Sequence, residues 1–207
     1  LDVLGSHMVM FQAGADDDIH TMRPLGMLAH PLADAAIKTS LVQRNVLSHP
    51  SLMIRRRFFD DVGLYNPALD FAEDYDLWCR GALLGKRYAN VPEALTWYRL
   101  HGGQVSHSKA QLQFERDVEV RRRYLTALLG DTPVAQLPQL LAGATRYASR
   151  EQAAQAIVES SAALVMLGSR VRDSAEYATL VKGCLQRHLL GPRAAAAAAN
   201  PAQGVPA

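Results

Sequence analysis

Cysteine is scarce in this sequence and a long hydrophobic run is missing, and each absence argues against certain classes of protein. The cysteines, Cys79 and Cys184, lie far apart with no spacing pattern, which argues against a disulfide framework and a cysteine-based metal site. No stretch approaches the roughly 20 uninterrupted apolar residues that span a bilayer. We therefore expect free thiols and a cytoplasmic protein, in solution or at the inner face of the membrane.

The sequence also has no large excess of charge of one sign. Lys and Arg total 22 against 20 Asp and Glu, which gives a formal net charge of +2. Such a balance provides no strong field toward nucleic acid or an anionic membrane, and we expect no nucleic-acid partner. With 49% hydrophobic and 20% charged residues, the 207-residue chain has the composition of a globular protein. Its length suits one large domain, or a domain with a small appendage.

The N-terminal segment lacks a long periodic pattern. Its residues Gly5-Ser6-His7-Met8 resemble the scar left where a protease site is joined to a cloning site. We therefore interpret residues 1–7 as a vector-derived tag and leave them out of the expectations for the fold. An acidic cluster follows at residues 16–18, and only the short run at residues 9–11 leads into it as a candidate strand.

Beyond this segment, hydrophobic periodicity predicts a mixed α/β region followed by a helical one. Residues 8–107 form the α/β region, 108–190 a helical appendage and 191–207 an Ala/Pro-rich tail. Glu73 begins a well-bounded helix, because acidic residues crowd its first turn and Gly85 closes it. The expected helices cover 31–43, 55–62, 73–84, 109–129, 134–146, 151–167 and 174–189, and the expected strands cover 52–54, 88–91 and 94–98.

Three sequence blocks carry the functional signal. The first runs from Asn45 to Arg56 (NVLSHPSLMIRR) and is followed by VGLY at residues 62–65. The second is AEDYDLWCR at residues 72–80, and the third combines NVPEAL at residues 90–95 with YRLH at residues 98–101. In this order and spacing, the blocks resemble the C-terminal, acceptor-side half of inverting family-2 glycosyltransferases. The resemblance implies a partial GT-A (Rossmann-like) sheet fragment followed by the helical appendage.

The resemblance also implies a chemistry for the Glu73-Asp74 pair. Inverting transfer of a sugar from a nucleotide diphosphate needs a base that takes the proton of the attacking hydroxyl. The family places this base at Asp74, with Glu73 holding the acceptor or tuning its neighbour. Without the surrounding motif, an acidic pair here would be interpreted as compensation of the helix dipole. Asp76 and Arg80 lie four residues apart and are expected to form a supporting ion pair.

Four further residues are candidates for substrate binding. His49 borders the active cleft in the resemblance, and Arg99 would contact the diphosphate. His101 would face the diphosphate or its metal, although an exposed loop histidine explains it equally well. Trp78 could stack on a sugar ring, but a helical tryptophan more often packs in the core. A divalent cation, Mg or Mn, is expected for the full-length enzyme because the departing diphosphate needs positive charge.

The sequence departs from the family pattern before residue 45. Family members begin with βαβ units that lead to an Asp-x-Asp signature for metal and sugar nucleotide, and no βαβ pattern occurs here. The acidic cluster at residues 16–18 imitates the signature, but we interpret it as a loop. We therefore expect a fragment without its donor-binding half, inactive alone. Its split sheet would be covered by self-association or by pairing the N-terminus against a free edge.

Two other functions stay open beside an enzyme that builds cell-surface polysaccharide or glycoconjugate. The chain could be a non-catalytic remnant that binds a glycan or a protein. Alternatively, the helical appendage could itself be the functional part, docking a partner through the apolar stripe of its first helix. The partners expected of a whole enzyme are a nucleotide-sugar donor and a glycan acceptor. The sequence leaves the donor sugar, the acceptor and the linkage open.

Overall fold

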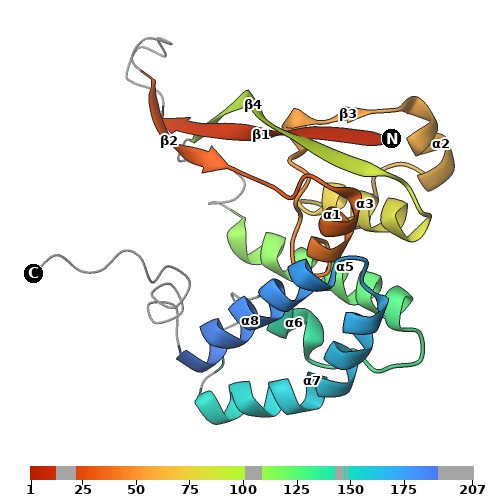
Figure 1. Cartoon of the computed structure of the whole chain (residues 1–207), viewed down its shortest axis with the longest axis vertical. Helices are drawn as coiled ribbons and strands as arrows, with labels where there is room; N and C mark the ends of the chain where they lie inside the picture. The colour runs from red at the N-terminus through yellow and green to blue at the C-terminus, as the bar shows by residue number, and fades with distance from the viewer. Residues whose placement is uncertain (13–21, 101–108, 143–146, 148, 191–207) are drawn as a thin grey trace, which may run out of the picture.

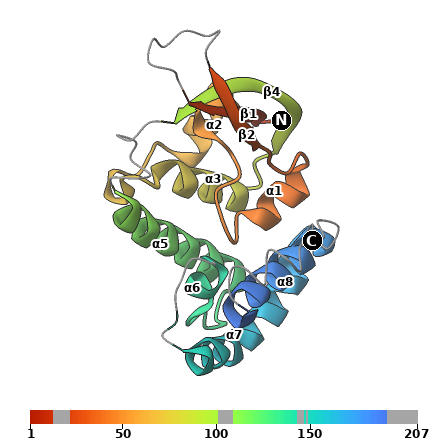
Figure 2. The same ribbon diagram turned by 90° about the vertical axis from the view of Figure 1, so that its left-hand side faces the viewer.

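The computed structural model describes residues 1–12, 22–100, 109–142, 147 and 149–190. These residues form a mixed α/β region and a helical region, which confirms the expected α/β class with a helical C-terminal part (Figure 1). The helices α1 (Asp34–Ser40) and α3 (Glu73–Leu83) lie beneath the sheet. The helices from α5 (Ala110–Leu129) to α8 (Ser174–Leu190) lie on the side of α1 and α3 that faces away from the sheet, as both views show (Figure 1, Figure 2).

The sheet is built around its first strand. Strand β1 (Val3–Gln12) pairs in parallel with β4 (Tyr88–Leu100) along its whole length. It pairs antiparallel with β2 (Arg23–Leu28) over its second half and with β3 (Met53–Ile54) near its start. Segments far apart in the sequence therefore meet on β1, which makes it the central strand of the described sheet.

Residues 1–7 were left out of the expectations for the fold, and the structure places residues 3–7 in strand β1. Val3 is fully buried, and Ser6 and His7 are 3% and 8% exposed. Gly5 belongs to the packing, because a Cβ atom there would overlap the Asn90 side chain and lie 2.8 Å from a Leu52 methyl group. The N-terminus pairs with strand edges of its own chain, which was one of the two expected ways of covering the split sheet.

Two expected strands also change. The predicted pair at 88–91 and 94–98 is one strand, β4, whose pairing with β1 shifts where Val91 lies opposite Ser6 and Ala94 opposite His7. Residues 92 and 93 therefore form an irregularity within the strand, a position where proline is tolerated because it has no amide hydrogen to donate. The predicted buried strand at 52–54 is the two-residue β3, and its Met53 is 74% exposed.

Aromatic side chains form the centre of the α/β core. Its helices are α1 (Asp34–Ser40), α2 (Arg56–Val62) and α3 (Glu73–Leu83), with 3-10 turns η2 at 49–51 and η3 at 67–69. The expected ion pair on α3 forms, with Arg80 Nε 2.7 Å from Asp76 Oδ2. The largest side chains buried in this core are Trp78, Tyr75, Tyr88 and Phe58.

The helical region consists of α5 (Ala110–Leu129), α6 (Leu137–Ala142), α7 (Arg150–Arg170) and α8 (Ser174–Leu190). Helix α5 packs against α3, and α8 packs against α1. Within the part of the chain that the structure describes, no helix is both long enough and apolar enough to cross a bilayer. The helical region is thus joined to the α/β region through the two helices that lie beneath the sheet.

Candidate active site

The candidate site lies at the N-terminus of α3. Ala72 precedes the helix without a side-chain cap, so the first turn relies on acidic residues to offset the dipole. Phe71 adopts a φ of 74°, a left-handed conformation that is strained for a bulky residue and often marks functional sites. Its carbonyl accepts a hydrogen bond of 3.2 Å from Gln113 on α5, which fixes the turn that presents Glu73 and Asp74.

Asp74 is held by two of the three sequence blocks. Asn45 donates from Nδ2 to Asp74 Oδ2 at 2.9 Å, and the Asn45 Oδ1 atom accepts from the Leu47 amide at 3.0 Å. The Tyr75 amide donates to the other carboxylate oxygen of Asp74 at 2.6 Å. Because Asn45 is itself anchored, it fixes the direction in which the Asp74 carboxylate faces.

Burial raises the pKa of Asp74 above its ordinary value, and the neighbouring Glu73 carboxylate raises it further. The Tyr75 amide, His49 and Asn45 oppose this shift, since each favours the charged carboxylate. A carboxylate with a raised pKa is a stronger base than an exposed one. The surroundings of Asp74 therefore suit the removal of a proton from a bound hydroxyl.

Glu73 has an unsatisfied oxygen. Among the described residues, its Oε2 atom is buried and accepts no hydrogen bond. The Glu73 and Asp74 carboxylates both raise the pKa of Tyr65, although burial has the largest effect on this hydroxyl. The charges of Glu73 and Asp74 thus both act on the Tyr65 hydroxyl, and the buried Oε2 of Glu73 is an acceptor without a donor among the described residues.

His49 and Tyr65 contact each other. His49 Nε2 lies 2.9 Å from the Tyr65 hydroxyl, and their ring centroids are 5.5 Å apart. Tyr65 was not among the predicted site residues, although it ends the VGLY segment that follows the first block. The Trp78 ring is fully buried, with its centroid 6.2 Å from His49 and 5.9 Å from Phe58. It packs in the core, where it cannot stack on a sugar.

The other predicted residues lie elsewhere. Arg99 is exposed near the end of β4, opposite Phe11 of β1. His101 and the acidic cluster at residues 16–18 fall outside the described residues. The described residues bring together no group of three or more His, Cys, Asp or Glu side chains able to hold a metal. They do not by themselves build the expected Mg or Mn site, which stays a prediction for the whole enzyme.

Asp117 on α5 is a site residue that the sequence did not reveal. Burial raises its pKa to about 6, and Asp74 adds to the increase while Arg121 opposes it. Asp117 lies on α5, which packs against α3, and the charge of Asp74 acts on it. The available signal was the spacing of Asp117 and Arg121, four residues apart on an amphipathic helix, which by itself indicates only a surface ion pair.

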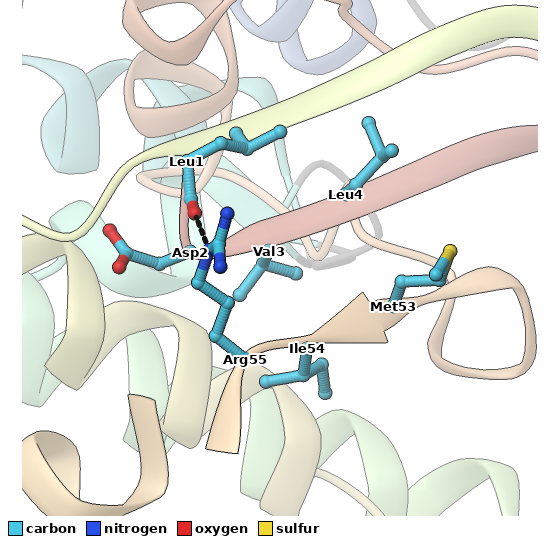
Figure 3. A pocket seen from close by; sticks show the side chains of 7 residues that line it. All are labelled: Leu1, Asp2, Val3, Leu4, Met53, Ile54 and Arg55. Atoms are coloured by element: carbon cyan, nitrogen blue, oxygen red, sulfur yellow. Dashed lines mark hydrogen bonds between the residues drawn. The ribbon is translucent and has the colours of Figure 1, made fainter. Parts of the chain in front are cut away.

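A small cavity lies beside the short strand β3. It measures about 300 Å³ and lies between the start of β1 and β3, where Arg55 Nε donates to the Leu1 carbonyl at 2.7 Å (Figure 3). Its lining residues are Leu1, Asp2, Val3, Leu4, Met53, Ile54 and Arg55. None of these belongs to the predicted site residues, so the cavity adds nothing to the candidate active site.

Comparison with known proteins finds similarity over about half of the chain. The chain is 32% identical over 101 residues, 48% of its length, to an uncharacterized glycosyltransferase of Haemophilus influenzae. It spans only 31% of the length of that relative. No family model and no solved structure matches the chain. The name of this relative specifies neither a family, a fold nor a linkage.

Proposed function

We propose that this chain is the acceptor-side part of an inverting, family-2 glycosyltransferase of GT-A fold, with Asp74 as its catalytic base. The observation that carries the proposal is the environment of Asp74. Asn45 orients its carboxylate at 2.9 Å, and burial together with Glu73 raises its pKa. Similarity to an uncharacterized glycosyltransferase supports the class of reaction.

We propose the following reaction at this site. An acceptor hydroxyl donates a hydrogen bond to Asp74, which takes its proton as the oxygen attacks the anomeric carbon of a nucleotide sugar. The new carbon–oxygen bond forms on the face opposite the leaving nucleotide diphosphate, so the bond to that diphosphate breaks with inversion. In this proposal the Glu73 carboxylate, adjacent to Asp74, accepts from a second hydroxyl of the acceptor and holds the ring in place. A divalent cation would supply positive charge to the diphosphate in the whole enzyme.

The donor site belongs, in this proposal, to a part of the protein that the matched segment does not include. The aligned segment covers 31% of the relative, and the described residues contain no cluster of metal ligands. We therefore expect that the isolated chain does not transfer sugar from a nucleotide sugar. Metal-dependent turnover of such a donor by this chain alone would contradict the proposal of a fragment.

Replacement of the base tests the proposed function in the whole protein. Asp74→Asn keeps the size and one of the two hydrogen bonds from Asn45 and Tyr75 but removes the proton acceptor, so kcat should fall by about 10²–10⁴-fold. Acceptor binding, measured by calorimetry, should change less than about threefold. The matched control is Asp70→Asn, an exposed aspartate just before α3, which should leave kcat within about twofold. If Asp74→Asn keeps full activity, a binding remnant becomes the better interpretation.

Asn45 offers a second test that is specific to orientation and pKa. Its hydrogen bond favours the charged form of Asp74, so Asn45→Ala should raise the pKa of this carboxyl further. The acid limb of the pH profile of kcat/KM should then move to higher pH. A lower rate with an unshifted acid limb would indicate that Asp74 is not the group that titrates.

A further inference from the structure

A second, larger cavity lies where the helical region meets the α/β region. It measures about 700 Å³, within the size range of small-molecule sites. Its walls come from the segment after α1 and from helices α5, α6 and α8. The residues that matter for its chemistry are Gln43, Arg44, Asp117, Arg121 and Arg187.

The cavity has a surplus of positive charge. Arg121 is only 3% exposed and donates from Nε to the Gln43 carbonyl at 2.9 Å and from Nη1 to the Pro138 carbonyl at 3.2 Å. These backbone contacts hold the guanidinium in place without neutralising it. Arg44 and Arg187 are exposed at the same cavity and form no ion pair with any described residue. Three guanidinium groups therefore face one carboxyl, that of Asp117.

Two lining residues relate the cavity to the proposed base. Arg44 immediately precedes Asn45, which donates to Asp74 at 2.9 Å. Asp117 lines the cavity, and Asp74 contributes to the increase of its pKa. Arg44 of the lining is thus one residue from the hydrogen-bond partner of Asp74, and Asp117 lies on α5, the helix that packs against α3.

We propose that this cavity binds a phosphate or diphosphate group carried by the acceptor, whose hydroxyl then reaches Asp74. Arginine pairs with phosphate through two parallel N–H···O bonds, and a group with two or more negative charges matches the three guanidinium groups. A neutral glycan would leave them without a counter-charge. The role as an acceptor site rests on the proposed function, whereas anion binding in the cavity does not.

Calorimetry on this chain with inorganic pyrophosphate tests the binding itself. Arg44→Gln and Arg187→Gln are exposed substitutions that should each weaken pyrophosphate binding at least about fivefold. Asp117→Asn should strengthen it about two- to fivefold by removing the opposing charge. The matched control is Arg56→Gln, which changes an exposed residue of α2. It removes the same charge outside the cavity and should change binding less than about twofold.

Pyrophosphate that does not bind, or that loses affinity equally in Arg56→Gln, would overturn the proposal. The donor is the other possible source of a diphosphate group. Titration of the whole protein with uridine diphosphate distinguishes a site for the acceptor from a site for the donor. Unchanged affinity in Arg187→Gln supports an acceptor site, and a loss of about fivefold would assign the cavity to the donor and overturn the proposal. Asp74→Asn should retain pyrophosphate binding, so a failure of the proposed base and a failure of the anion site give different results.

Discussion

The α/β region and the helical region bury different kinds of side chain. Beneath the sheet, the large buried groups are aromatic, and polar residues such as His7, Asn90 and Asp76 are buried with them. The helical region buries mainly leucine and alanine, with Leu137, Leu140 and Leu167 fully excluded from solvent. Directional hydrogen bonds and ring contacts hold the core of the α/β region together. The core of the helical region depends mainly on the fit of apolar side chains. The candidate base lies in the region whose core is directional.

Two tyrosines show how this directionality fixes the site. The Tyr75 hydroxyl donates to the Leu41 carbonyl at 2.5 Å, and the Tyr88 hydroxyl donates to the Trp78 carbonyl at 2.8 Å. They connect α3 to the segment after α1 and to β4. Asp74, adjacent to Tyr75, is therefore positioned by bonds that have a required angle as well as a required distance. The helical region contributes to the same site through Asp117, on a helix that packs against α3.

The largest effect should come from emptying the aromatic core. Trp78→Ala removes a fully buried indole, and the remaining cavity should lower the free energy of unfolding by about 4 kcal/mol. Leu167→Ala, at an equally buried position of α7, should cost about 3 kcal/mol. Urea denaturation measures both values. The control Val165→Ala, 77% exposed on the same helix, should change stability by less than about 0.5 kcal/mol. A larger loss for Leu167→Ala than for Trp78→Ala would contradict the comparison.

The same glycine substitution should have opposite signs in the two regions. A Cβ atom on Gly81 of α3 would overlap the Tyr88 hydroxyl and lie 2.8 Å from ring carbons of Phe58. Gly81→Ala should therefore destabilise the protein by about 2 kcal/mol, despite the better helix propensity of alanine. A Cβ atom on Gly183 of α8 would lie 3.5 Å from Arg187, an ordinary contact. Gly183→Ala should stabilise by about 0.5–1 kcal/mol, and thermal denaturation that shifts both variants in one direction would refute the contrast.

Asp117 should make stability depend on pH. Its folded pKa of about 6 exceeds the ordinary value of 3.8, so the folded state favours the protonated carboxyl. That contribution is fully present below about pH 4 and is lost as the pH rises through about 6. Asp117→Asn mimics the neutral acid, so at pH 8 it should be more stable than the wild type by about 1–2 kcal/mol.

At pH 4 the same variant should match the wild type, because both then carry an uncharged group at this position. Urea denaturation at the two pH values measures the difference. The control Asp131→Asn changes an exposed residue beyond α5 and should shift stability equally at both pH values. A gain for Asp117→Asn that is the same at pH 4 and pH 8 would show that the charge of Asp117 is not its cause.

Local signals predicted the helices better than the strands. Helix α3 begins at Glu73 as expected, because acidic residues and a closing glycine are encoded within its own segment. Strand β1 was missed because its stability comes from pairing with β4, more than 80 residues away, while Gly5, Ser6 and His7 interrupt any alternation of apolar residues. β4 was divided at Pro92, because a bulge opposite β1 cannot be distinguished from a turn without its partner strand.

The residues of the candidate site likewise differ in whether a local motif or only the tertiary packing reveals them. Glu73, Asp74 and His49 could be selected from the sequence because they occur within the first and second sequence blocks. Asp117 could not, because its proximity to Asp74 depends on how α5 packs against α3. The buried position of Trp78 follows from its contacts with Phe58 and His49, which a helical pattern leaves undetermined.

The smallest expected effect concerns the junction of the two regions. Ser40 at the end of α1 is fully buried and donates from Oγ to Glu176 Oε1 on α8 at 2.7 Å. Ser40→Ala removes this bond but leaves Glu176 accessible to water, so it should cost about 1 kcal/mol. The control Ser161→Ala removes an exposed hydroxyl that bonds only within α7, and it should change stability by less than about 0.5 kcal/mol. Because α1 and α8 belong to different regions, Ser40→Ala should move a single unfolding transition, recorded by both fluorescence and circular dichroism. Two separate transitions, with only one displaced, would mean that the helical region folds independently of the α/β region and that Asp117 is only loosely held near Asp74.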